Sequence, residues 1–120
     1  MKNDILSFIE KRQHVSMVEL CREIPGFSGD LEWYINTNTV IWSSVSKEAI
    51  QAMNELMKSQ MIIPIITAPL VYMVDGAMLN YPIAKSQTVN YKTPRWMSVV
   101  FSTKKQVIKD KQRWKNRIKN

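Results

Sequence analysis

The chain has 120 residues, of which 45% are apolar, so length and composition fit one globular domain with its own core. No apolar run approaches the roughly 18–20 residues that cross a bilayer, and the N-terminus lacks the pattern of a secretory signal. One cysteine, Cys21, excludes an internal disulfide and fits a reducing compartment, so we expect a cytoplasmic protein.

Charge is distributed unevenly along the chain, whose net charge is +7. Residues 86–120 contain ten Lys and Arg and one acid, Asp110, for a net charge of +9. Residues 1–85 contain seven bases and nine acids, for a net charge of −2. Such asymmetry indicates a polyanionic partner for the C-terminal segment.

Two helices are expected first. Asp4 or its neighbour Asn3 can cap a helix over about 4–12. Ser16 and Glu19 have the spacing of a capping box at the start of a second helix, about 17–24. The Pro-Gly pair at 25–26 ends that helix, because neither residue continues one well.

The middle of the chain predicts an irregular loop over 26–37, a short strand over 39–42 and a third helix over about 47–60. The loop is rich in Gly, Ser, Asp and Asn, and the strand is β-branched and aromatic. Ser46 caps the third helix, whose apolar face is formed by Ala49, Ile50, Met53, Leu56 and Met57.

A β-rich stretch is expected next. Residues 62–66 form a strand in which Pro64 indicates an edge or a bulge. Residues 70–74 and 77–81 form a hairpin around Asp75-Gly76, because a tight two-residue turn needs the positive φ that these residues tolerate.

The C-terminal quarter predicts a linker over 85–95, a strand over 96–101 and a basic helix over about 104–117. Thr103 and Gln106 have the spacing of a weak capping box at the start of this helix.

The order of two capped helices, a strand, a third capped helix and a hairpin resembles the winged helix-turn-helix domain. The residues that carry the resemblance are Ser16–Ile24, Ser46–Gln60 and the "wing" on 70–81, over roughly 3–84. We therefore expect a winged-helix-like α+β fold, with three helices plus a small antiparallel β-sheet and a basic C-terminal helical arm. The expected division is 1–84 for that domain, 85–102 for a linker or extra strand, and 103–120 for the arm.

One feature departs from the family pattern. About twenty residues separate the second and third helices, where a compact helix-turn-helix has a short turn. In its general character, the sequence also resembles those of small accessory proteins of bacterial temperate phages and mobile elements. That resemblance implies a bacterial cell and a role in transcription regulation.

The sequence contains few residue patterns that could support catalysis. One histidine, His14, and one cysteine, Cys21, cannot form a Cys/His metal site within one chain. Cys21 lies on the apolar stripe of its helix, so we expect it to be buried and unreactive. The chain has no glycine-rich phosphate-binding motif. We expect no cofactor, no metal and no enzymatic activity.

The third helix carries a polar stripe suited to reading base edges. Amide side chains pair with adenine, and lysine pairs with guanine or phosphate, when a helix enters the major groove. Glu48 and Glu55 on the same helix repel phosphates, so a plain solvated face stays an open alternative. The stripe consists of Lys47, Gln51, Asn54 and Lys58.

The basic C-terminal helix is the stronger candidate for binding a polyanion, because counterion release favours such binding. Trp114 can stack on a base or pin the helix to the domain. A solvated C-terminus that aids solubility remains an alternative, as does an acidic protein surface. The thin apolar stripe argues against a membrane-surface helix. The candidate DNA-binding residues here are Lys104, Lys105, Lys109, Lys111, Arg113, Lys115 and Arg117.

The sequence therefore predicts a small, non-enzymatic DNA-binding protein whose partner is duplex DNA. The rival hypothesis is an interaction module of a phage or mobile element that binds a host or phage protein. The acidic 1–85 region favours that rival. The oligomeric state, including a homodimer, is left open.

Overall fold

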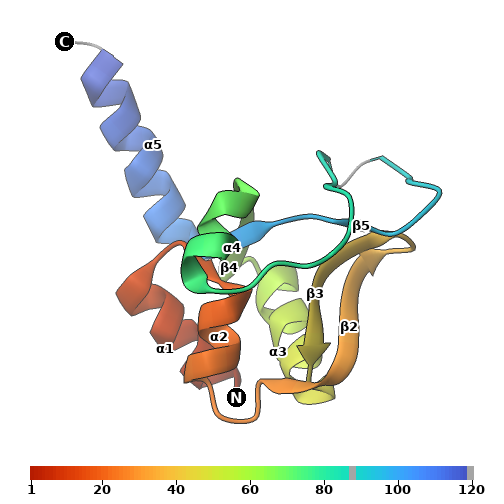
Figure 1. The fold of residues 1–120 in the computed structure, drawn as a ribbon. Helices are drawn as coiled ribbons and strands as arrows, with labels where there is room; N and C mark the ends of the chain where they lie inside the picture. The colour runs from red at the N-terminus through yellow and green to blue at the C-terminus, as the bar shows by residue number, and fades with distance from the viewer. Residues whose placement is uncertain (87–88, 119–120) are drawn as a thin grey trace.

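The structure is a computed structural model that describes residues 1–86 and 89–118, without the side chains of residues 117 and 118. It is an α+β fold with two small sheets (Figure 1). The helices are α1 (Lys2–Arg12), α2 (Met17–Glu23), α3 (Lys47–Lys58), α4 (Pro69–Asp75) and α5 (Lys104–Ile118). The strands are β1 (Val15–Ser16), β2 (Ser28–Asn36), β3 (Thr39–Val45), β4 (Ile62–Ile66), β5 (Arg95–Trp96) and β6 (Val99–Thr103).

The two sheets join segments that lie far apart in the sequence. One sheet has the order β1-β6-β4, with β6 antiparallel to both neighbours. The other has the order β2-β3-β5, in which β2 and β3 are antiparallel and β5 runs parallel to β3. Strands from residues 95–103 therefore pair with strands from earlier parts of the chain, so this segment is built into the body of the fold.

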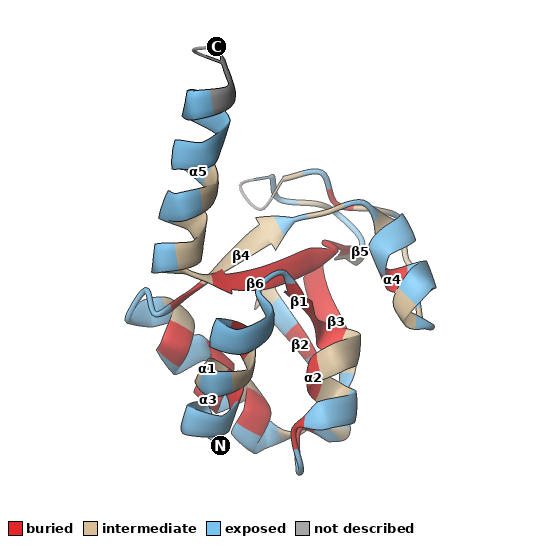
Figure 2. Ribbon diagram, turned by 90° about the vertical axis from the view of Figure 1, so that its left-hand side faces the viewer, coloured by how far each residue is buried: buried red, intermediate tan, exposed pale blue. Residues whose placement is uncertain are grey.

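The core is rich in aromatic side chains. Tyr72 packs edge-on against Trp96 with ring centroids 5.1 Å apart, and Trp42 lies 5.0 Å from Tyr72. Trp33 stacks on Phe101 at 6.2 Å. Figure 2 shows the buried segments, in red, concentrated on β6, β3 and the inner faces of the helices below them. No described helix has both the length and the apolar character that crossing a membrane requires.

The helix caps expected at Ser16, Ser46 and Thr103 are confirmed. The Ser16 Oγ accepts a hydrogen bond from the Glu19 backbone N–H at 3.2 Å, and the Glu19 side chain completes the capping box. The Ser46 Oγ accepts from the Ala49 N–H at 3.1 Å. The Thr103 Oγ1 accepts from the Gln106 N–H at 3.2 Å, and Gln106 returns the bond to the Thr103 N–H.

The edge position expected for Pro64 is also confirmed, because β4 is the last strand of its sheet. The Thr67 N–H donates to the Ser98 carbonyl on the β6 side. Backbone N–H groups alternate along a strand, so the ring nitrogen of Pro64 faces the open edge. Proline there removes no hydrogen bond from the sheet. It also offers no N–H to another strand, so it hinders further pairing at this edge.

The winged-helix expectation is wrong, although the α+β class is right. The described part of the chain has five helices and two three-stranded sheets, rather than three helices and one small sheet. Residues 26–37 are not an irregular loop, because 28–36 form β2, which pairs with β3 in a hairpin. This hairpin separates α2 from α3, where a helix-turn-helix would have a tight turn.

The predicted wing is not a hairpin: its first half is helical, and residues 77–81 form no strand. Residues 69–75 form α4, and Gly76 ends it in the left-handed conformation with φ 106°. The Ala77 N–H donates to the Tyr72 carbonyl and the Gly76 N–H to the Met73 carbonyl, both at 3.1 Å, which is the Schellman pattern. The Asp-Gly pair that favours a hairpin turn also favours this helix end. Pro69 at the first helical position is the signal that distinguishes the two.

Gly76→Ala is expected to lower the free energy of unfolding by about 1 kcal/mol, because a β-carbon disfavours positive φ. A Cβ at this position would meet no atom within 4 Å, so the cost comes from the backbone alone. Chemical denaturation measures it. Gly76→Asn is the control and should lose less, since asparagine tolerates this conformation. Equal stability of the alanine variant and the parent would contradict the assigned helix end.

Candidate nucleic-acid interface

Helix α5 is fixed to the body only at its base. The Gln106 Nε2 donates to the Ile9 and Glu10 carbonyls of α1, each at 3.0 Å. One turn later, Asp110 Oδ2 lies 3.2 Å from His14 Nε2. The one acid of this helix is thus directed at a side chain of the body. These contacts set the direction in which the helix leaves the domain.

Beyond that base, α5 projects away from the body. Figures 1 and 2 show its C-terminal half extending clear of the other elements in both views. Each cationic side chain described on the helix is exposed, and none takes part in the four ion pairs found among the described residues. The described cations are Lys104, Lys105, Lys109, Lys111, Arg113 and Lys115. Arg117 lies in the last turn, but its side chain and Lys119 are outside what the structure describes.

Trp114 lies on the projecting part of the helix and is 64% exposed. It lines a shallow hollow of about 270 Å³ together with His14, Asp110 and Arg113. The indole therefore does not pin the helix to the domain. Its face is available to stack on a base, and such stacking contributes about 1–3 kcal/mol.

Two larger grooves border the base of α5. One, of about 410 Å³, has Lys104, Lys105 and Lys109 on the α5 side and apolar Leu6 and Met61 among its other residues. Lysine ammonium groups that meet at one groove can hold successive phosphates.

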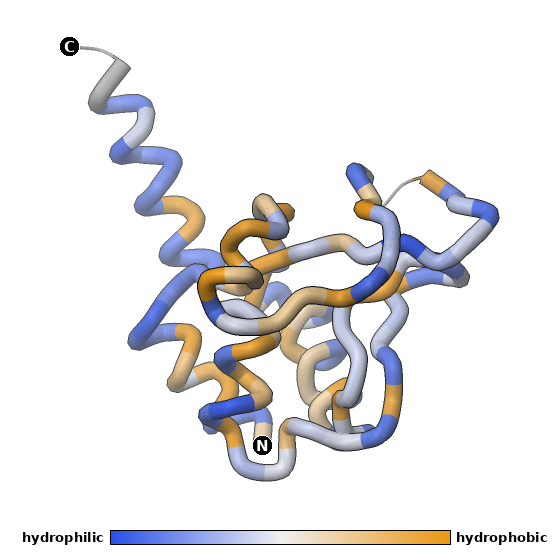
Figure 3. Tube along the Cα trace, viewed as in Figure 1, coloured by the Kyte–Doolittle hydropathy of each residue, from blue (hydrophilic) through white to orange (hydrophobic). Residues whose placement is uncertain are grey.

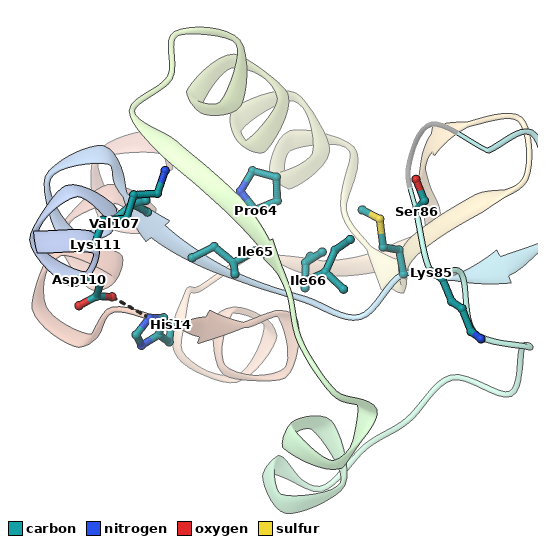
Figure 4. Close-up of a pocket in the computed structure, with 11 residues that line it drawn as sticks. His14, Pro64, Ile65, Ile66, Lys85, Ser86, Val107, Asp110 and Lys111 are labelled. Atoms are coloured by element: carbon teal, nitrogen blue, oxygen red, sulfur yellow. Dashed lines mark ion pairs between the residues drawn. The ribbon is translucent and has the colours of Figure 1, made fainter. Parts of the chain in front are cut away.

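The other groove, of about 620 Å³, lies between α5 and β4 (Figure 4). Pro64, Ile65 and Ile66 of β4 contribute its apolar part, and His14 and Asp110 lie at one end. Lys111 lies at that same end, and Lys85 lies at the other. The groove therefore combines an apolar surface with separated positive charges.

The polar stripe of α3 is exposed and separate from α5. Its four side chains are all exposed, as are Glu48 and Glu55 on the same helix. Glu55 binds the Lys2 ammonium at 2.7 Å. The structure brings the end of α3 toward α5, where the Lys104 Nζ donates to Gln60 Oε1 at 3.4 Å. The start of the α3 stripe lies far from α5. The two are at opposite ends of the body (Figure 1). The stripe is Lys47, Gln51, Asn54 and Lys58.

Sequence reasoning missed the contacts that orient α5. Gln106 was expected to cap the helix, and its second role as a donor to α1 has no local signal, because the partners are 96 and 97 residues away.

Sequence reasoning also missed Glu32, whose carboxylate accepts hydrogen bonds from Tyr34 and Tyr81. The Glu32 hydrogen bond raises the pKa of Tyr34 to about 12.

Cys21 is half-buried rather than fully buried. Burial raises the pKa of its thiol, opposed in part by contacts with Ser28 and Trp42. A raised pKa reduces the thiolate fraction near pH 8, so a thiol reagent should label the native protein more slowly than the unfolded chain. Stopped-flow labelling across pH 7–9 checks this. Equal native and unfolded rates would contradict it.

Within residues 1–86 and 89–118, no three His, Cys, Asp or Glu side chains gather closely enough to hold a metal ion.

The comparisons with known proteins found no matching protein-family model, no similar curated protein and no similar solved structure.

Proposed function

We propose that this protein binds nucleic acid, as duplex DNA, and that α5 makes the main contact. The observation that carries the proposal is a projecting helix whose described cations are all exposed and unpaired with acids of the body. The sequence of α5 contains seven Lys or Arg and one acid. Neutralising phosphates with such a helix releases condensed counterions, which supplies affinity without base recognition.

The direction of α5 supports a contact with an extended polyanion. Anchoring at Gln106 and Asp110 holds the helix in one orientation, so less conformational freedom is lost on binding. Lys104, Lys105 and Lys109, which line the groove of about 410 Å³, extend the positive surface back to the body. A helix also has the width that the major groove of B-DNA admits.

Any sequence preference would come from another element. Gln51 and Asn54 on α3 are exposed and have the side chains that pair with adenine edges. Glu48 and Glu55 lie on the same helix and weaken its attraction for phosphates. We therefore assign affinity to α5 and any preference among sequences to α3.

The experiment compares single variants on two duplexes of unrelated sequence, one of them selected for tight binding. Lys109→Ala and Arg113→Ala should weaken both duplexes alike, by roughly eightfold each at about 0.1 M salt, because each removes one phosphate contact. Gln51→Ala and Asn54→Ala should weaken only the selected duplex. Unchanged affinity for both duplexes after Lys109→Ala and Arg113→Ala would refute the role of α5.

A second candidate function is docking of an acidic protein segment in the groove between α5 and β4. The apolar side chains of β4, with Lys85 and Lys111 at the two ends, favour it. Labelled duplex and a labelled polyglutamate peptide of similar charge separate the two candidates. The preferred proposal expects the duplex to bind more tightly, and the reverse order would favour the acidic protein partner.

A further inference from the structure

Trp114 differs from the other three tryptophans of the chain in being exposed. Its side chain is 64% exposed, on the projecting part of α5, which Figure 3 shows as mainly hydrophilic. Each of the others is at most 7% exposed and packs in the core: Trp33, Trp42 and Trp96. The Trp114 ring therefore adds little to the core, and its face can meet a ligand.

The hollow of about 270 Å³ beside Trp114 combines three kinds of group that a nucleobase can contact. The indole offers an aromatic face for stacking. The Arg113 guanidinium offers N–H donors, and the Asp110 carboxylate offers acceptors. The edge of a base carries both acceptors and donors. The hollow therefore suits a flat ring with a polar edge better than a purely apolar side chain.

The charges around the hollow favour a ring that carries phosphate. Lys111 precedes Trp114 by three residues, so the two side chains are neighbours on the helix surface. Arg113 and Lys115 adjoin Trp114 in the sequence, and all three cations are exposed. They outnumber Asp110, the one acid of the helix. An uncharged aromatic ligand would gain nothing from these cations, whereas a nucleotide brings its own anionic phosphate.

We propose that this hollow binds an unpaired base, so that α5 prefers DNA in which a duplex continues into a single-stranded tail. The proposal rests on the proposed function, because the phosphates of the duplex bind the cations of α5. Bases inside a duplex are stacked on both faces and cannot offer one to Trp114. A base beyond the duplex end is free to leave its neighbours and stack on an aromatic side chain.

Three DNA molecules that share one duplex test the proposal with the full chain. The first is blunt, the second carries a short deoxyadenosine tail, and the third carries an abasic tail of equal length. The two tails have the same phosphates, so the difference between them measures the contribution of the bases alone. We expect the deoxyadenosine tail to bind at least about fivefold more tightly than the abasic tail, from the usual strength of base–aromatic stacking.

The failure of this proposal can be told apart from the failure of the proposed function. Equal affinity for the two tails, with the blunt duplex still bound, would overturn the preference for an unpaired base and leave duplex binding intact. If the chain binds none of the three molecules, both proposals are wrong.

Trp114→Ala should lower the affinity for the deoxyadenosine tail to that for the abasic tail. Trp114→Phe should keep part of the difference, because a phenyl ring still stacks. Ile108→Ala is the matched control: it removes an apolar side chain that is 47% exposed on the same helix and outside the hollow, so it should keep the whole difference. An alanine variant of Trp114 that keeps the difference would overturn the proposal.

Tryptophan fluorescence reports the stacking directly, because Trp114 is the one exposed tryptophan of the four. A base stacked on the indole shields it from a dissolved quencher such as acrylamide. At saturating DNA, we expect less quenching with the deoxyadenosine tail than with the abasic tail. Equal quenching with both tails would contradict a base bound at Trp114.

Discussion

Replacing Lys105, Lys109, Lys111 and Lys115 with glutamine is expected to weaken binding to a DNA duplex about fiftyfold or more. Each phosphate contact contributes roughly eightfold to affinity at about 0.1 M salt, from a log–log slope of about 0.9 per contact. These lysines are exposed on different sides of α5, so we expect one duplex to contact at least two of them. Fluorescence anisotropy of a labelled duplex measures the loss.

The control for this variant changes the same amount of charge elsewhere. Lys2, Lys11, Lys85 and Lys92 are also exposed and lie outside α5. Replacing these four with glutamine should reduce affinity only a fewfold, through the weaker long-range field. Similar losses for both variants would mean that net charge, rather than the projecting helix, determines binding. Circular dichroism should show both variants folded, since glutamine and lysine have similar helix propensities.

Gly29→Ala is expected to lower the free energy of unfolding by about 3 kcal/mol, at the upper end of the usual cost of overpacking. A Cβ on Gly29 would lie 2.5 Å from the Ser46 Cα and 2.7 Å from its backbone nitrogen. Backbone atoms cannot rotate away as a flexible side chain can. The Ser46 N–H also donates to the Phe27 carbonyl at 2.8 Å, and Ser46 caps α3, so a shift would disturb both elements.

Ser28→Ala is the control for this substitution, because Ser28 is exposed and precedes Gly29 in β2. It should change stability by no more than about 1 kcal/mol, because it removes one exposed hydrogen bond, from Ser28 Oγ to the Cys21 carbonyl at 3.3 Å. Denaturant unfolding of the two variants gives the comparison. A Gly29→Ala protein as stable as the parent would show that β2 and the start of α3 do not approach as closely as described.

The helix and strand signals that succeeded were local. Ser16, Ser46 and Thr103 each lie directly before a helix, and a capping side chain acts within three residues of its position. Pro64 was correctly placed at a sheet edge, because its missing N–H is tolerated only there or at a bulge. The basic helix after Thr103 was also expected, and α5 spans residues 104–118.

The failures involve signals that are ambiguous or non-local. Gly, Ser and Asp at 28–30 indicated a loop, but pairing with β3 makes this stretch a strand, so tertiary context overrides local propensity. Asp75-Gly76 fits a hairpin turn as well as a helix end, and Pro69 at the first helical position is what favours the helix. The close approach of Gly29 to Ser46 has no signal in the sequence, because it depends on how the hairpin packs on α3.

The candidate interface was predictable in composition but not in geometry. The run of cations after Thr103 is plain in the sequence. That the helix projects, and that Gln106 and the His14–Asp110 pair set its direction, follows from contacts across more than 90 residues of chain. The exposure of Trp114 likewise depends on that direction, so the sequence alone leaves stacking and pinning open.

The most direct test of the proposed function is a salt titration of duplex affinity with the unmodified full chain. If α5 neutralises four or five phosphates, the logarithm of the association constant should fall with the logarithm of salt concentration with a slope of about −4. Binding should be readily measurable with micromolar protein at about 50 mM salt. Absence of binding under those conditions, or an affinity that does not change with salt, would contradict nucleic-acid binding by α5.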